Sequence, residues 1–439
     1  MSDFEKQPLI TSSNEQHTYS NVIKNEEIIK KATLPGGLTV FKCAVFIFSS
    51  ITGSGVLALP YALSNAGWSG IILLMFVCVL SGYCGVICGK CWMIVRKKKP
   101  NVDYTRDPFP AIGHAAAGNV GYIFTEISVL LSLMGVSVVF LILGSQQFVS
   151  IIGKSFDGVS KIDELRAAIF ICGVVLIPFQ WLGTSKDIAS FIVGASVCTA
   201  IASFIIVYES IAILSKNGFP ETRRDVTGES FFMAFGTIAF TFGGGTLFPS
   251  FQADMQKPSK FPLALVLGFV GVLFIYLPAA LLPFLVIGEP NVDIMISLKS
   301  NMAVDHKYLL TIAQCLISIH ILSTIVLVNN PISLQIEEHL KIPHASGWKR
   351  ILVRTLVGLL LTGIGILFPH LGPVITIVGA FTVSVVSFIL PVWFYMKLNN
   401  YVIPLHVKVL HIEIILVAGV FGALGIYSGV VEMIKQYHL

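Results

Sequence analysis

Two short glycine clusters interrupt apolar segments that are otherwise long enough to cross a membrane. The first occupies residues 53–55 (GSG) and is followed by Pro60, and the second occupies residues 243–245 (GGG) and is followed by Pro249. A helix that breaks inside hydrocarbon leaves backbone N–H and C=O groups without partners, which is costly when lipid surrounds them. Such a break persists where another molecule pairs with the freed groups. Both clusters therefore predict a binding site for a small polar solute.

A zwitterion suits a site made of two such breaks. The helix that restarts after residues 53–55 offers N–H groups and the positive end of its dipole to a carboxylate. Freed carbonyls around residues 242–244 accept hydrogen bonds from an ammonium group, and glycine has no side chain to hold the solute away. An α-amino acid carries both groups on one carbon. The residues predicted to contact it are Thr52, Gly53, Ser54, Gly55, Phe242, Gly243 and Gly244.

A second set of side chains lies on one face of an apolar segment at residues 308–332. His320, Ser323 and Thr324 are spaced i, i+3 and i+4, so a helix brings them together. A titratable group inside a membrane is costly and usually functional, and an imidazole takes up a proton at acidic pH. A neutral histidine at a helix interface, and hydroxyl groups bonded back to their own helix, are the alternatives.

The composition predicts an integral membrane protein. Hydrophobic residues make up 55% of the chain and charged residues 12%, and the mean hydropathy is +0.83. The basic residues are scattered around predicted helix ends rather than gathered in one patch, which argues against nucleic-acid binding. The sequence contains no nucleophile with a base and an orienting partner, and no metal-binding spacing, so we expect neither an enzyme nor a cofactor or metal site.

Eleven transmembrane helices are predicted, each an apolar run of about 20 residues or more. They lie near residues 38–64, 67–95, 120–146, 167–183, 188–214, 231–253, 261–288, 308–332, 351–370, 373–396 and 411–433. The basic run at residues 96–99 and the distribution of the other Lys and Arg residues favour a cytoplasmic N-terminus and a C-terminus on the opposite side. We therefore expect a cytoplasmic tail at 1–36, a transmembrane domain at 37–433 and a short non-cytoplasmic tail at 434–439.

The two glycine clusters belong to the first and the sixth predicted helix. Five spans separate them, so the two broken helices run in opposite directions across the membrane. This predicts two halves of inverted topology, each beginning with a discontinuous helix, with a binding site near the middle of the bilayer. Close packing of helices is the alternative use of glycine, but two clusters that are each followed by a proline favour breaks.

Three stretches resemble the amino acid/auxin permease family of eukaryotic secondary transporters. They are GSGVLALPYALSNAGW, FGTIAFTFGGGTLFPSFQADMQKPSKF and NNPISLQIEEHL, and the resemblance extends over residues 36–433. It implies an all-α membrane fold similar to that of the leucine transporter, with a five-plus-five inverted repeat, discontinuous first and sixth helices and one extra C-terminal helix. It also implies amino acid carriage by alternating access, driven by a proton or a sodium gradient.

The resemblance also bears on the coupled ion. Several members of the sodium-coupled branch that resemble this chain carry an Asn four residues before the first glycine of the first cluster, and this chain has Ser49 there. Because of this departure we expect a proton rather than sodium. In this fold the eighth helix flanks the first, which makes Ser49 a natural partner of Ser323 and Thr324 for a cation. The predicted ion-coupling residues are Ser49, His320, Ser323 and Thr324.

The N-terminal tail contains a motif that resembles an acidic dileucine sorting signal, formed by Glu5, Leu9 and Ile10. Clathrin adaptors read such signals on polar cytoplasmic tails, so we expect an endolysosomal or vacuolar membrane, with the plasma membrane as the alternative. The expected function is secondary active transport of amino acids, with neutral ones favoured. A sodium-coupled carrier and an amino acid sensor with the same pocket are the alternatives. The expected partners are the amino acid, a proton and membrane lipid.

Overall fold

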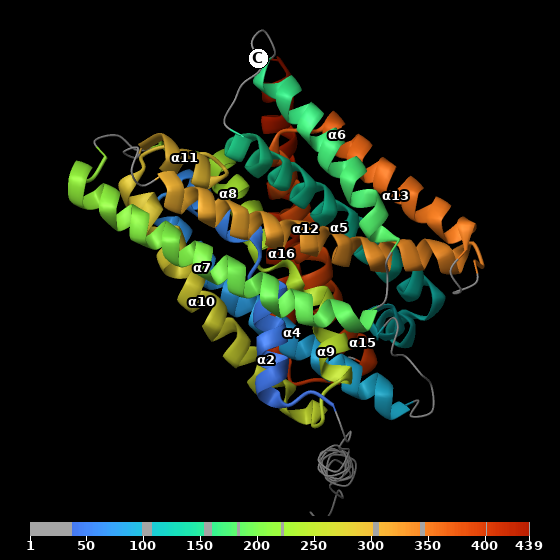
Figure 1. Cartoon of the computed structure of the whole chain (residues 1–439). Coiled ribbons are helices and arrows are strands. Elements are labelled where there is room, and N and C mark those ends of the chain that lie inside the picture. The colour runs from blue at the N-terminus through green and yellow to red at the C-terminus, as the bar shows by residue number, and fades with distance from the viewer. Residues whose placement is uncertain are drawn as a thin grey trace, which may run out of the picture.

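The computed structural model shows a chain made of helices, labelled as in Figure 1. The residues that it describes are 37–98, 108–152, 160–181, 185–220, 224–301, 307–342, 347–400 and 402–438. The first helices are α2 (Val40–Ile51), η1 (Ser54–Ala58), α3 (Leu59–Ala66), α4 (Ser69–Lys98), α5 (Pro108–Ile152), α6 (Lys161–Gln180) and α7 (Ser185–Asn217). Next come α8 (Gly228–Thr241), η2 (Gly243–Leu247), α9 (Phe248–Ala253), η3 (Pro258–Lys260), α10 (Phe261–Val286) and α11 (Ile294–Asn301). The last are α12 (Lys307–His339), α13 (Trp348–Leu367), α14 (Leu371–Phe381), η5 (Thr382–Ile389), α15 (Leu390–Leu398) and α16 (Leu405–His438).

Nine helices in the described ranges are long and apolar enough to cross a membrane. The pair α2 and α3, which bends by 50°, makes a tenth span when it is counted as one. The eleventh predicted span corresponds to α6. That helix has 20 residues, but its first two turns carry Lys161, Asp163, Glu164 and Arg166. Charges lower the membrane propensity of a segment, so the predicted number of eleven spans stays a prediction while the all-helical membrane fold is confirmed.

Both predicted breaks are present, and each is a short 3₁₀ turn rather than a fully unwound segment. The first predicted span consists of α2, η1 and α3, and the sixth predicted span consists of α8, η2 and α9. In a 3₁₀ turn the hydrogen bonds join residues three apart. The N–H of Leu59 thus donates to the carbonyl of Val56, and the N–H of Phe248 donates to the carbonyl of Gly245. The breaks therefore leave fewer free backbone groups than complete unwinding would.

The two prolines that follow the glycine clusters begin the second half of each broken span. Pro60 lies in the first turn of α3, and Pro249 lies in the first turn of α9. Proline is well tolerated there because its missing N–H would have no partner in the first turn of a helix. The glycine clusters end one helix and the prolines start the next.

Several helices are longer than the hydropathy pattern predicted, and α5 and α12 show how this arises. Helix α5 begins at Pro108 instead of near residue 120, because Ala117 and Gly118 leave helical geometry and join a short helical stretch to the span. Gly118 has a φ of 62°, a left-handed conformation that glycine adopts at little cost. Helix α12 continues to His339 instead of ending near 332, because it accommodates Pro331 in its interior at the loss of one backbone hydrogen bond.

The helices pack in two groups. In the first group α6 and α13 lie side by side and both pack against α5, which also packs against α12 (Figure 1). In the second group α2 packs against α10, α3 against α8, and α8 against α14. Helices α7 and α12 also pack against each other. The broken spans thus belong to one group and face unbroken helices of the other.

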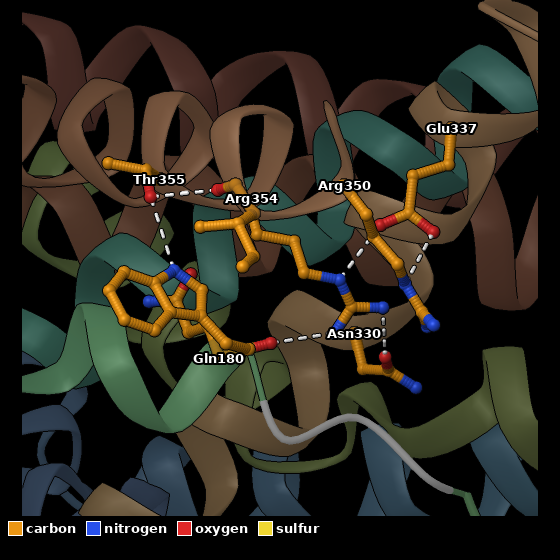
Figure 2. Close-up of polar contacts among 8 residues, drawn as sticks. Gln180, Asn330, Glu337, Arg350, Arg354 and Thr355 are labelled. Atoms are coloured by element: carbon orange, nitrogen blue, oxygen red, sulfur yellow. Dashed lines mark hydrogen bonds and ion pairs between the residues drawn. The ribbon is translucent and has the colours of Figure 1, made fainter. Parts of the chain in front are cut away.

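A buried ion pair ties α6, α12 and α13 together (Figure 2). Arg354 of α13 is 1% exposed, and its Nε donates to a carboxylate oxygen of Glu337 on α12 at 2.8 Å. Its other nitrogens donate to the Gln180 carbonyl of α6 at 2.6 Å and to the Asn330 side chain of α12 at 3.1 Å. The Nε of Arg350 lies 3.2 Å from the second oxygen of Glu337. Because a buried charge is costly without partners, this set fixes the relative positions of the three helices.

A short β-bridge connects the segment before α2 to the segment after α9. The N–H of Leu38 donates to the carbonyl of Asp254 at 2.7 Å, and the N–H of Gln256 donates to the carbonyl of Leu38 at 2.9 Å. A Cβ on Gly37 would lie 2.6 Å from the Asp254 carbonyl oxygen, so only glycine fits there. The two broken spans are therefore joined at this end as well as at their breaks.

Candidate functional site

A cavity of about 140 Å³ lies between the two broken spans on one side and α5 and α12 on the other. The broken spans contribute Ser49, Ser50, Ile51, Gly53, Gly55, Phe240, Thr241, Gly243, Gly244, Thr246 and Leu247. The other helices contribute Ser132, Leu133, Val136, Phe140, His320, Thr324, Leu327, Val328 and Pro331 from α5 and α12, and Thr382 from η5. The cavity therefore lies at the two breaks, where the glycine clusters predicted a binding site.

Four of the predicted substrate contacts line this cavity through their backbone, namely Gly53, Gly55, Gly243 and Gly244. Three others do not line it with a side chain that the structure describes. Thr52 is fully buried outside the lining, and the ring of Phe242 stacks on Phe269 with centroids 6.2 Å apart. Ser54 begins η1, and its side chain lies outside the described part of the structure. These three residues are therefore neighbours in sequence of residues that line the cavity.

The two breaks approach each other so closely that a side chain at Gly55 or Gly244 would require neighbouring atoms to shift. A Cβ on Gly55 would lie 2.9 Å from Cγ2 and 3.2 Å from Cα of Thr241. A Cβ on Gly244 would lie 3.1 Å from Cγ1 of Ile51 and 3.2 Å from the carbonyl oxygen of Ser50. At Gly243 a Cβ would meet open space. Gly55 and Gly244 thus bring the two chains together, whereas Gly243 borders the open part of the cavity.

One side chain that the sequence did not single out contacts both breaks. The hydroxyl of Tyr276 on α10 lies 2.6 Å from the Ile51 carbonyl oxygen and 3.3 Å from the Thr241 carbonyl oxygen. Tyr276 is fully buried. A single tyrosine in an apolar helix gives the same sequence signal as ordinary packing, so the sequence does not predict this contact.

His320 and Thr324 of the predicted ion-coupling set line the cavity together. The Nε2 atom of His320 lies 3.3 Å from the Thr324 hydroxyl, which also donates to the His320 carbonyl at 2.8 Å. A Cβ on Gly53 would lie 3.4 Å from that Nε2 atom, so the imidazole faces the first break. A titratable ring therefore lies beside the predicted carboxylate position.

The other two residues of that set behave differently. Ser49 lines the cavity, is 4% exposed, and its hydroxyl makes no hydrogen bond within the described chain. Ser323 does not line the cavity, and its hydroxyl donates to the Ile319 carbonyl of its own helix at 2.7 Å. The structure thus brings Ser49, His320 and Thr324 to one cavity and places Ser323 beside it.

Apolar side chains form much of the remaining wall. Phe140 of α5 and Phe240 of α8 meet edge to face, with centroids 6.1 Å apart and an interplanar angle of 87°. Leu133 and Val136 continue this wall along α5. Among the described residues that line the cavity, none is Asp, Glu, Lys or Arg. In the sequence, apolar residues spaced three or four apart indicate ordinary helix packing. In the structure these side chains line the cavity and form a surface that suits an uncharged side chain.

A second buried polar contact joins α11 to α5. Asp293, just before α11, is 1% exposed and accepts hydrogen bonds from the Gln147 side chain of α5 and from the N–H of Met295 at 3.0 Å. Lys299 of α11 donates to the Ser150 carbonyl of α5 at 2.5 Å. Because α11 also contacts η1, these hydrogen bonds hold α11 against the first break.

The Asp293 carboxyl gives a pH-dependent stability. Burial raises its pKa to about 7, although the hydrogen bonds from Met295 and Gln147 act in the opposite direction. The unfolded chain, where an aspartate has a pKa of about 3.9, binds this proton more weakly. The contribution of this protonated carboxyl to the free energy of unfolding is therefore complete below about pH 4. It declines by about 1.4 kcal/mol per pH unit as the pH rises towards 7.

We expect Asp293→Asn to remove this slope from the unfolding midpoint, measured in detergent between pH 5 and pH 7. The control is Glu289→Gln, which changes an exposed carboxyl in the same loop. An identical pH slope in the wild type and in Asp293→Asn would show that the buried carboxyl is not protonated in the folded protein.

Comparisons with known proteins show the family to which the chain belongs. A family model described as transmembrane amino acid transporter protein matches residues 36–435. The Arabidopsis thaliana amino acid transporter AVT1C is 23% identical over 398 residues, which cover 88% of this chain and 68% of the relative. The Arabidopsis thaliana amino acid transporter AVT3C is 26% identical over 383 residues, which cover 81% of this chain and 82% of the relative.

Two solved structures share the fold. MhsT in complex with L-phenylalanine matches with a TM-score of 0.62 at 11% identity, over 88% of this chain and 98% of that one. The Eremococcus coleocola manganese transporter matches with a TM-score of 0.55 at 14% identity, over 91% of this chain and 90% of that one. Because the family model covers nearly the whole chain, the protein belongs to the amino acid/auxin permease family of transmembrane amino acid transporters.

Proposed function

We propose that the protein is a secondary active transporter that carries neutral α-amino acids by alternating access, coupled to protons rather than sodium. Membership of the family makes it a membrane amino acid transporter and not an enzyme. The observation that carries the finer proposal is the cavity between the two breaks, which has glycine backbone on one side and uncharged walls on the other.

The cavity offers complementary positions for the three parts of an amino acid. The turn after Gly53, continued by α3, directs backbone N–H groups and a positive dipole end towards a carboxylate. The carbonyl side of the second break, around residues 242–244, accepts from the ammonium. The side chain then lies against Phe140 and Phe240. MhsT, which shares the fold, was solved with L-phenylalanine, so a cavity in this fold accommodates an aromatic amino acid.

The shape of the cavity supports alternating access. Its lining runs along α5 from Phe140 back to Ser132, and along α12 from His320 to Pro331. Both directions lead towards the end of the molecule where α4 ends in a basic segment, which the positive-inside rule assigns to the cytoplasm. We infer an inward-facing state of a fold with eleven spans, in which two inverted repeats of five helices are followed by α16.

His320 is the proposed proton carrier, assisted by the hydroxyl groups of Ser49 and Thr324. We expect His320→Gln to abolish accumulation of a labelled neutral amino acid driven by a pH gradient in proteoliposomes. Counterflow without a gradient is expected to persist, because exchange moves no net proton. His339→Gln makes the same change on the same helix at a side chain that is 67% exposed, and is expected to behave like the wild type.

The same assay separates the possible ions. A sodium gradient that drives uptake by the wild type without any effect of pH would overturn proton coupling. Unchanged gradient-driven accumulation by His320→Gln would overturn the role of that residue.

The proposed location is an endolysosomal or vacuolar membrane. The acidic dileucine-like residues Glu5, Leu9 and Ile10 lie outside the described residues, and they support sorting by a clathrin adaptor. Imaging of a tagged chain with Leu9 and Ile10 replaced by alanine tests this location. Relocation to the plasma membrane is expected, and an unchanged location would contradict the proposal.

A further inference from the structure

The α-helical halves of both broken spans end in carbonyl groups that converge on one hydroxyl. Ile51 is the last residue of α2 and Thr241 is the last residue of α8. The oxygen of the Tyr276 hydroxyl lies 2.6 Å from the first carbonyl oxygen and 3.3 Å from the second. Both carbonyls lie at helix C-termini, where the helix dipole adds negative partial charge. The junction of the two breaks is therefore electronegative. The Gly53 N–H donates to the Ile51 carbonyl at 2.8 Å, and the Tyr276 hydroxyl is directed at both carbonyls.

Aromatic packing fixes the position of this hydroxyl. Tyr276 is fully buried, and Phe242 meets its ring edge to face with centroids 5.9 Å apart. Phe242 itself stacks on Phe269, which belongs to α10 like Tyr276. Because the ring is held by its neighbours, the hydroxyl stays at the junction instead of following one of the two half-helices.

Converging carbonyls at the ends of half-helices are the environment in which transporters of this type of architecture hold a cation. An O–H group meets the same electrostatic requirement with its single proton, shared between two acceptors in a three-centre hydrogen bond. We propose that Tyr276 is a positioning residue that ties the C-terminal ends of α2 and α8 together and takes the place of a coordinated cation between the two breaks. This inference rests on the proposed transport function.

The hydroxyl acts on the substrate through the two half-helices that it aligns. With the ends of α2 and α8 tied, the backbone groups of Gly53 and Gly243 are held ready for the amino acid before it binds. Loss of the hydroxyl leaves two buried carbonyls without this donor, so binding becomes weaker while later steps proceed. We expect Tyr276→Phe to raise KM about tenfold with little change in the maximal rate, which equals about 1.4 kcal/mol.

The test is counterflow of a labelled neutral amino acid in proteoliposomes that contain the full-length protein, in sodium chloride or in the chloride of a large organic cation. Tyr276→Phe is expected to show the raised KM in both salts, because its ring still fills the junction. Tyr276→Ala vacates the space, so sodium is expected to lower its KM relative to the organic cation. A merely structural role of the side chain would not create this rescue by sodium.

Tyr83→Phe is the matched control. It deletes the same atom from another tyrosine, whose hydroxyl pairs with His411 Nε2 at 2.9 Å and contacts neither break, so its KM is expected to stay at the wild-type value. If Tyr276→Phe has the KM of the wild type, the inference is overturned. It is also overturned if Tyr276→Ala assembles and has the same KM in both salts. If Tyr276→Ala does not assemble, Tyr276→Phe decides alone. Absence of any amino acid flux in the wild type would instead overturn the proposed function.

Discussion

Replacing Gly55 with alanine is expected to reduce amino acid flux on the order of 100-fold, because a shift of about 1 Å at a binding site has effects of this size. The added methyl group would lie 2.9 Å from Cγ2 of Thr241 and 3.2 Å from its Cα. Thr241 cannot turn away, since its side chain is branched at Cβ and its hydroxyl donates to the Ile238 carbonyl at 2.6 Å. The two broken spans must therefore move apart, and the backbone groups that bind the substrate separate.

Two other glycines serve as matched controls for this prediction. Gly363 lies in α13 with open space around its Cβ position, so alanine there is expected to leave transport unchanged. Gly243 lines the cavity, and a Cβ there would meet open space. Gly243→Ala is therefore expected to reduce flux less than Gly55→Ala does, and to reduce the flux of bulky substrates more than that of small ones. The initial rate per reconstituted protein is the measurement. Flux by Gly55→Ala equal to that of Gly363→Ala would contradict the close approach of the breaks.

Replacing Arg354 with leucine is expected to destabilise the protein by about 3–5 kcal/mol, the usual effect of removing one partner from a buried ion pair. Glu337 is 1% exposed and, among the described residues, would keep Arg350 alone as a cationic partner. The Gln180 carbonyl and the Asn330 side chain would also lose the guanidinium donor. The unfolding midpoint of the purified protein in detergent measures this loss.

A double-mutant cycle separates this ion pair from simple packing. The combined change Arg354→Leu with Glu337→Leu is expected to be more stable than Arg354→Leu alone, because it removes the fully buried carboxylate, while Arg350, which loses Glu337 as its partner, is 17% exposed. The surface pair of Lys435 and Glu229 is the control, since Lys435→Gln is expected to leave the midpoint nearly unchanged. Additive effects of the two leucine substitutions would contradict the network that Figure 2 shows.

The breaks were predictable because glycine and proline have backbone properties that no other residues share. Clusters at 53–55 and 243–245, with Pro60 and Pro249 behind them, mark the end of one helix and the start of the next. Most spans were predictable from hydropathy because a run of apolar residues, like a glycine cluster, is a local property of the sequence. It did not find the start of α5, because the bend at Gly118 joins a segment that does not belong to the apolar run.

The side chains that complete the site were not predictable in the same way. Tyr276 matters because α10 packs against α2, and the sequence carries no record of that distance. Helical spacing placed Ser323 on one face with His320, but its hydroxyl bonds to the Ile319 carbonyl of its own helix. The partnership of Arg354 with Glu337 likewise depends on how two separate helices pack. Local patterns predict elements and breaks, whereas these contacts depend on tertiary packing.

The most direct test of the central claim is a competition experiment that removes one pole of the zwitterion at a time. Counterflow of labelled leucine in wild-type proteoliposomes is measured with three unlabelled competitors, which are leucine, 3-methylbutylamine and 4-methylpentanoate. The amine lacks the carboxylate of leucine, and the acid lacks its ammonium group. If the two breaks bind the two poles, leucine competes and both analogues are weaker by at least about 100-fold, because each leaves buried polar groups unpaired. Competition by either analogue at the strength of leucine would contradict the claim that both breaks bind the substrate.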